Sequence, residues 1–198
     1  MTAMRNTTGT YESCHARPVM SLRWGYSTGI AVLAPVSTVT EAVAAAAAGA
    51  GLVDVGEDDA LILQIRDAVP EVGICGHGGG ADIVHDAALA ARAGAGLICR
   101  DTGTAAGAVQ RGIAPERILL QTAPEDVRAA SRSGWAALVD LDQGTDALAR
   151  AEAVAAVCAW VGAKVIRTRH VAEIRRCLDM TESILGVRRP AWTLRGLA

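Results

Sequence analysis

The stretch "AARAGAGLICRD" (residues 90–101) joins an alanine-rich segment to a short apolar run through two glycines. The stretch "AAAAAGAGLVDVG" (44–56) repeats the arrangement. Alanine favours helices, glycine ends them, and a short aliphatic run is typical of a buried strand. Both stretches are therefore predicted to be a helix, a tight loop and a strand, which is the repeating unit of a parallel sheet.

The same rhythm extends along the chain in both directions. Predicted strands cover residues 18–24, 51–56, 72–76, 96–101, 117–122, 136–142 and 163–168, with an extra run at 29–36 that no helix precedes. Predicted helices cover residues 38–50, 57–68, 81–94, 104–111, 124–133, 145–161 and 171–185.

Apolar character on both faces of these strands indicates a parallel sheet covered by helices. An open doubly wound sheet and a closed barrel both fit this pattern. Seven or eight strands favour the barrel. The predicted fold class is α/β, a small TIM-type (β/α) barrel of seven to eight parallel strands.

Composition sets the limits on partners. The chain has 198 residues, which suit one domain over 18–198 after a flexible polar arm over 1–17. A net charge of -2 and an aromatic content of 3% argue against a nucleic-acid partner. The longest apolar run is broken by glycine and ends in Asp54, so we expect no membrane span. Five cysteines without a CxxC pair favour a reduced, cytoplasmic setting.

The carboxyl ends of the strands are where ligands bind in either architecture. The segment "RTRH" there places Arg167, Arg169 and His170 between an apolar strand and a helix. A guanidinium beside a helix N-terminus suits a phosphate or a carboxylate, which indicates an anion site. Two alternatives stay open: a solvated turn, or internal pairing of Arg167 with Asp54, Asp101 or Asp140.

Two further patterns near the strand ends can be explained either by ordinary structure or by a binding function. The segment "CGHGGG" (75–80) could form a backbone nest for an anion, although a flexible loop is the better explanation. Cys75, His77 and Cys99 could bind zinc, but buried thiols account for the cysteines. We expect no metal and no cofactor, and assign no catalytic residue.

Several segments resemble the dihydropteroate synthase family, in the same order as in that family. They are "VMSLRWGYST" (19–28), "AAAAAGAGLVDVG" (44–56), "DIVHDAALAARAGAGLICRDTG" (82–103), "GIAPERILLQ" (112–121), "GWAALVDLD" (134–142) and "VCAWVGAKVIRTRHVAEIRRCLDMTESI" (157–184). The resemblance implies a TIM barrel that lacks one βα unit, because "RDTGTAAGAVQRG" (100–112) runs directly into "IAPERILLQ" (113–121), where the family has its fifth strand region. It also implies descent from enzymes that join a dihydropterin diphosphate to p-aminobenzoate and release pyrophosphate.

Most of the family's site residues are replaced. The first-loop Asn is missing from "RWGYSTG" (23–29), the third- and sixth-strand Asp from "CGHGGG" and "LLQTAPEDV" (119–127), and the seventh-strand Lys from "LDQG" (141–144). The family pattern keeps Asp54, Asp101 and Arg167. Arg169 stands where the family has His, and His170 where it has Asp.

These departures imply that the ordinary synthase reaction is lost. The resemblance therefore predicts a folate-related pseudoenzyme that acts as a non-canonical binding or partner subunit. The expected partners are a second copy, forming a homodimer, or an active enzyme, forming a heteromer, through the late helices 145–161 and 171–185. The alternative is an enzyme with new chemistry that binds a phosphorylated or carboxylated small molecule with Arg167, Asp54, Asp101, Arg169 and His170.

Overall fold

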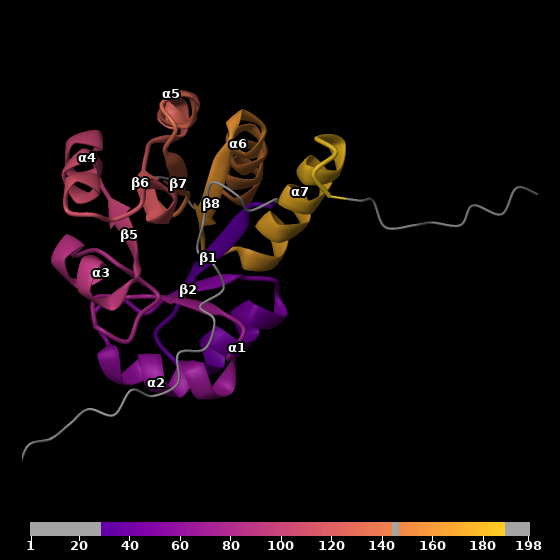
Figure 1. The fold of residues 1–198 in the computed structure, drawn as a ribbon. Coiled ribbons are helices and arrows are strands. Elements are labelled where there is room, and N and C mark those ends of the chain that lie inside the picture. Colours follow the sequence, from indigo (N-terminus) through magenta and orange to yellow (C-terminus); the bar gives the residue numbers. More distant parts are fainter. Residues whose placement is uncertain (1–28, 144–146, 189–198) are drawn as a thin grey trace, which may run out of the picture.

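Eight short parallel strands close into a barrel in the computed structural model, which describes residues 29–143 and 147–188 (Figure 1). The strands are β1 (Ala31–Pro35), β2 (Leu52–Asp54), β3 (Gly73–Cys75), β4 (Ile83–Val84), β5 (Gly96–Cys99), β6 (Ile118–Gln121), β7 (Ala136–Asp140) and β8 (Ala163–Arg167). They follow chain order around the barrel, and β1 pairs with β8 to close it. The predicted TIM-type barrel is confirmed, with eight strands.

Helices surround the barrel, and in the described residues one follows each strand except β3 (Figure 1). They are α1 (Val39–Ala47), α2 (Asp59–Ala68), α3 (Ala87–Ala93), α4 (Thr102–Gln110), α5 (Val127–Arg132), α6 (Leu148–Val161) and α7 (Val171–Ile184), with 3-10 turns at Pro115–Arg117 and Pro124–Asp126. None of the helices in the described ranges is long and apolar enough to cross a membrane.

The core has two layers, because strand side chains alternate between the two faces. One buried side chain from each strand fills the barrel interior: Leu33, Leu52, Cys75, Ile83, Ile98, Leu119, Leu138 and Val165. A larger aliphatic layer lies between the strands and the helices. Small aliphatic side chains suit both layers, which is how a chain without Phe closes so narrow a barrel.

The first strand differs from the sequence prediction. The run at 29–36, set aside as an extra, contains β1, which pairs with both β2 and β8. The predicted strand at 18–24 and the arm at 1–17 lie outside the described residues.

The region around β4 also differs. Residues 81–94, predicted as one helix, hold β4 and then α3, because the Asp86 side chain accepts the Leu89 amide at 2.6 Å and caps α3 there. A loop without a helix joins β3 to β4. The predicted loss of one βα unit between residues 100–112 and 113–121 is wrong, because all eight strands are present and α4 connects β5 to β6 there; the connection without a helix is the one from β3 to β4.

Two glycines predicted as helix ends act as such. Gly94 and Gly162 follow α3 and α6 with φ of 68° and 110°, a left-handed conformation that suits a residue without Cβ. Each then delivers the chain directly into the next strand.

Candidate functional site

A three-residue ion cluster lies at the carboxyl end of the barrel. The register places Arg167 opposite Asp140 across β7–β8, and β1 separates β8 from β2, which ends at Asp54. Arg167 Nε lies 3.2 Å from Asp54 Oδ2, and Arg167 Nη1 lies 3.1 Å from Asp140 Oδ2. The guanidinium thus joins strand ends that are far apart in sequence.

Each carboxylate of the cluster is itself held by the turn that follows its strand. Asp54 Oδ1 accepts the Gly56 amide at 3.1 Å, and Asp140 Oδ1 accepts the Asp142 amide at 3.0 Å. Asp140 Oδ2 also accepts a bond from Gln143 Nε2 at 3.2 Å. These bonds fix the carboxylates in position to receive the guanidinium.

The charge state of Arg167 follows from these contacts. Burial alone would lower the pKa of the guanidinium, but the carboxylates of Asp140 and Asp54 outweigh it and raise the pKa above its ordinary value. The internal pairing considered from the sequence is therefore present for Asp54 and Asp140. Two of the guanidinium nitrogens, Nε and Nη1, already bond to carboxylates of the protein.

The other three predicted site residues have different surroundings. Asp101 caps α4, accepting the Thr104 amide at 2.7 Å and the Thr104 hydroxyl at 2.8 Å, and within the described residues no hydrogen bond or ion pair joins it to Arg167. Arg169 Nε lies 3.5 Å from Asp142 Oδ1 on an exposed part of the rim. The His170 amide bonds to Thr168 Oγ1 at 3.1 Å at the start of α7. Of the five residues, Arg167 and Asp54 form an ion pair with each other.

A histidine pair stands at the rim beyond β3 and β4. His77 and His85 stack with ring centroids 4.9 Å apart, and Cys75 Sγ lies 3.7 Å from His85 Nε2. Burial, then the neighbouring His77, lower the pKa of His85, against a smaller opposing effect of Asp54. Within the described residues, no group of three or more His, Cys, Asp and Glu side chains is placed to hold a metal ion. His85 was missed because its segment was predicted as helix.

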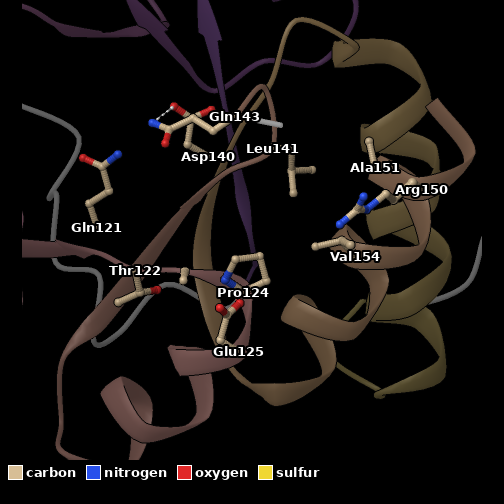
Figure 2. A pocket seen from close by; sticks show the side chains of 11 residues that line it. Gln121, Thr122, Pro124, Glu125, Asp140, Leu141, Gln143, Arg150, Ala151 and Val154 are labelled. Atoms are coloured by element: carbon tan, nitrogen blue, oxygen red, sulfur yellow. Dashed lines mark hydrogen bonds between the residues drawn. The ribbon is translucent and has the colours of Figure 1, made fainter. Parts of the chain in front are cut away.

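A pocket of about 480 Å³ opens beside the ion cluster, outside the barrel axis (Figure 2). One wall comes from the ends of β6 and β7, with Gln121, Thr122 and Asp140, and the opposite wall from α6, with Arg150 and Val154. The sequence marked Gln121 and Asp140 as strand ends. Nothing in its pattern marked Arg150, which is one exposed arginine in an alanine-rich helix.

Of the cysteines in the described residues, Cys75, Cys99 and Cys158 are buried and Cys177 is half-buried. Cys75, Cys99, Cys158 and Cys177 are all free. Burial raises the pKa of the Cys158 thiol to about 11, and it raises that of Cys75 well above its ordinary value. These thiols are protonated and unreactive at neutral pH.

Comparison with known proteins extends the family resemblance. No family model matches the chain. Over 126 aligned residues it is 33% identical to "Inactive dihydropteroate synthase 2" of Mycobacterium tuberculosis and of Mycobacterium bovis. The match covers 52% of this chain, and the chain spans only about 40% of the length of these curated relatives.

Solved structures agree on the fold. Rv1207 of Mycobacterium tuberculosis superposes with a TM-score of 0.69 and 26% identity, covering 83% of this chain and 96% of that one. The Yersinia pestis dihydropteroate synthase superposes with a TM-score of 0.66 and 16% identity over 80% of this chain and 93% of that one, which is a likeness of fold alone. In sequence over those 126 residues, and in the barrel and the order of its segments, the chain is therefore similar to the dihydropteroate synthases.

Proposed function

We propose that this chain is a dihydropteroate synthase-like protein without the ordinary synthase reaction, which acts as a partner subunit. The observation that carries the proposal is the state of Arg167. This retained anion ligand of the family pattern is held by Asp54 and Asp140 at 3.2 and 3.1 Å. A diphosphate would have to compete with two carboxylates that are already fixed by their own turns.

The name of the curated relatives supports the first half of the proposal, since those proteins are called inactive synthases. The replaced residues support it as well. "LDQG" provides no lysine after β7, and "CGHGGG" provides no carboxylate after β3. The polar edge of a pterin needs such partners to satisfy its donors and acceptors.

An exposed apolar face on the late helices supports the second half. Val157 and Trp160 lie one turn apart on α6, and Met180 and Ile184 one turn apart on α7, each between 59% and 66% exposed. The two helices pack side by side (Figure 1). Large apolar side chains that are exposed on two neighbouring helices are a feature of protein interfaces. We infer that this face binds a second copy of the chain, with an active synthase as the other candidate partner.

Two measurements test the proposal. Wild-type protein should release no pyrophosphate from dihydropterin diphosphate and p-aminobenzoate in the presence of Mg²⁺. Turnover by the wild type that the Arg167→Ala variant lacks would refute the loss of activity.

Light scattering should give a dimer for the wild type and a monomer for Trp160→Glu. The matched control is Leu63→Glu, because Leu63 is 69% exposed on α2, which packs against α1. A monomeric wild type, or equal effects of both variants, would refute the homodimer.

The alternative is an enzyme with new chemistry at the mouth, acting on a phosphorylated or carboxylated small molecule. The pocket that borders Asp140 favours it. Calorimetric titration with pyrophosphate and p-aminobenzoate, on the wild type and on Arg167→Ala, tests it. Binding that the variant loses supports the alternative, and absence of binding removes it.

A further inference from the structure

The pocket between β6, β7 and α6 contains charges that the ion cluster does not use. Asp140 belongs to the cluster, but Arg150 on α6 and Glu125 at the start of α5 line the same pocket. Among the described residues, neither side chain forms an ion pair or a side-chain hydrogen bond, and none joins the two. The pocket therefore carries one cation and one anion that no side chain of residues 29–143 and 147–188 pairs.

The two charges stand on different walls. Figure 2 shows the guanidinium of Arg150 reaching from α6 toward the space between Leu141 and Pro124, while the carboxylate of Glu125 lies beside Pro124. Leu141, Val154 and Pro124 supply apolar surface to the same space. A complementary ligand carries an anionic group, a cationic group and an apolar body.

An unsatisfied hydroxyl adds an independent observation. Thr122 Oγ1 is buried and has no hydrogen-bond partner among the described residues, although Thr122 lines the pocket. A buried polar atom without a partner costs about 1–3 kcal/mol, so such an atom commonly indicates a group that is supplied by something else.

We propose that this pocket binds a small zwitterion with an apolar side chain, of the α-amino acid class. Arg150 receives its carboxylate, Glu125 its ammonium, and Leu141 and Val154 its side chain, while Thr122 Oγ1 bonds to one of the charged groups. The volume of about 480 Å³ falls within the roughly 300–1,000 Å³ of small-molecule sites. Because the charged side chains are exposed, the affinity is weak, with a Kd of about 1 mM.

The proposal is independent of the partner role. It uses neither the Arg167 guanidinium nor the apolar face of α6 and α7, and it invokes no chemical step. A zwitterion bound here leaves the ion cluster intact. Loss of the dimer and loss of this binding are therefore separate outcomes.

The test compares three probes of similar shape by isothermal titration calorimetry on the full chain. L-leucine carries both charges, 3-methylbutylamine lacks the carboxylate, and 4-methylpentanoate lacks the ammonium. L-leucine should bind saturably, and each truncated probe should bind at least about tenfold more weakly than L-leucine. Absence of saturable L-leucine binding overturns the proposal, and so does 4-methylpentanoate binding as well as L-leucine, which would indicate an anion site.

Variants then assign the contacts. Arg150→Gln and Glu125→Gln should each weaken L-leucine binding about tenfold, whereas Arg132→Gln, which changes an exposed arginine on α5, should leave it unchanged. Thr122→Val should weaken binding while leaving the melting temperature equal or higher, because it removes an unsatisfied buried hydroxyl. Binding that survives both charge variants overturns the assignment. If Thr122→Val lowers the melting temperature and leaves L-leucine binding unchanged, the Thr122 hydroxyl stabilises the fold and does not bind the ligand.

Discussion

The ion cluster at the barrel mouth makes a measurable prediction for Arg167→Met. The substitution keeps most of the side-chain volume but removes the charge that Asp54 and Asp140 share. Those carboxylates are only 16% and 10% exposed, so their charge is left partly buried without a cation. The expected result is a clear loss of stability.

The magnitude follows from the geometry. Two unit charges 3.2 Å apart interact by about 5 kcal/mol at an effective dielectric constant of about 20, before the cost of desolvating them is subtracted. Losing one partner of a fully buried pair costs about 3–5 kcal/mol net, and the 26% exposure of Arg167 places this cluster near the low end. We therefore expect a loss of about 3 kcal/mol, or about 6–12 °C in melting temperature for a chain of this length.

Thermal and chemical denaturation at neutral pH measure the effect. The matched control is Arg169→Met, which removes a 58% exposed arginine 3.5 Å from Asp142 and should cost less than about 1 kcal/mol. A triple variant, Arg167→Met with Asp54→Asn and Asp140→Asn, should recover part of the loss, since the amides can still accept the turn bonds. A single variant as stable as the wild type, or a triple variant less stable than the single one, would show that the cluster is not a structural ion network.

Three further predictions concern the rim and the core. Burial and His77 lower the pKa of His85, so as the pH falls this histidine is protonated in the unfolded chain before it is protonated in the folded one. The free energy of unfolding should therefore decrease as the pH is lowered from about 7.5 to about 5.5. Denaturation midpoints should fall less over that range in His85→Asn; an unchanged pH profile contradicts the shift. Iodoacetamide should modify Cys75 and Cys158 only after unfolding, which peptide mass spectrometry would detect, and rapid native labelling would contradict their burial. Leu119→Ala in the barrel interior should cost about 2–5 kcal/mol by urea denaturation; a cost under about 1 kcal/mol would argue against a packed interior.

The barrel itself could be predicted from local patterns. Alanine-rich helices that end at Gly94 or Gly162 and pass straight into aliphatic strands encode their own boundaries, since propensity and glycine conformation act within a few residues. The prediction failed near β4, a strand of two residues. So short a strand has no periodicity of its own, and its place is set by pairing with β3 and β5.

The sequence by itself determined which residue types reach the strand ends, because the carboxyl ends of parallel strands face one side and β2, β7 and β8 end in Asp54, Asp140 and Arg167. Which of them touch was decided only by the closed barrel. Closure places β8 between β7 and β1, so that Arg167 can reach Asp54 across 113 positions of sequence while Asp101 stays with α4 as its cap. The pocket arises in the same way, since Thr122, Asp140 and Arg150 meet only after β6, β7 and α6 have packed. Such contacts depend on the register and tilt of distant elements, which no local pattern encodes.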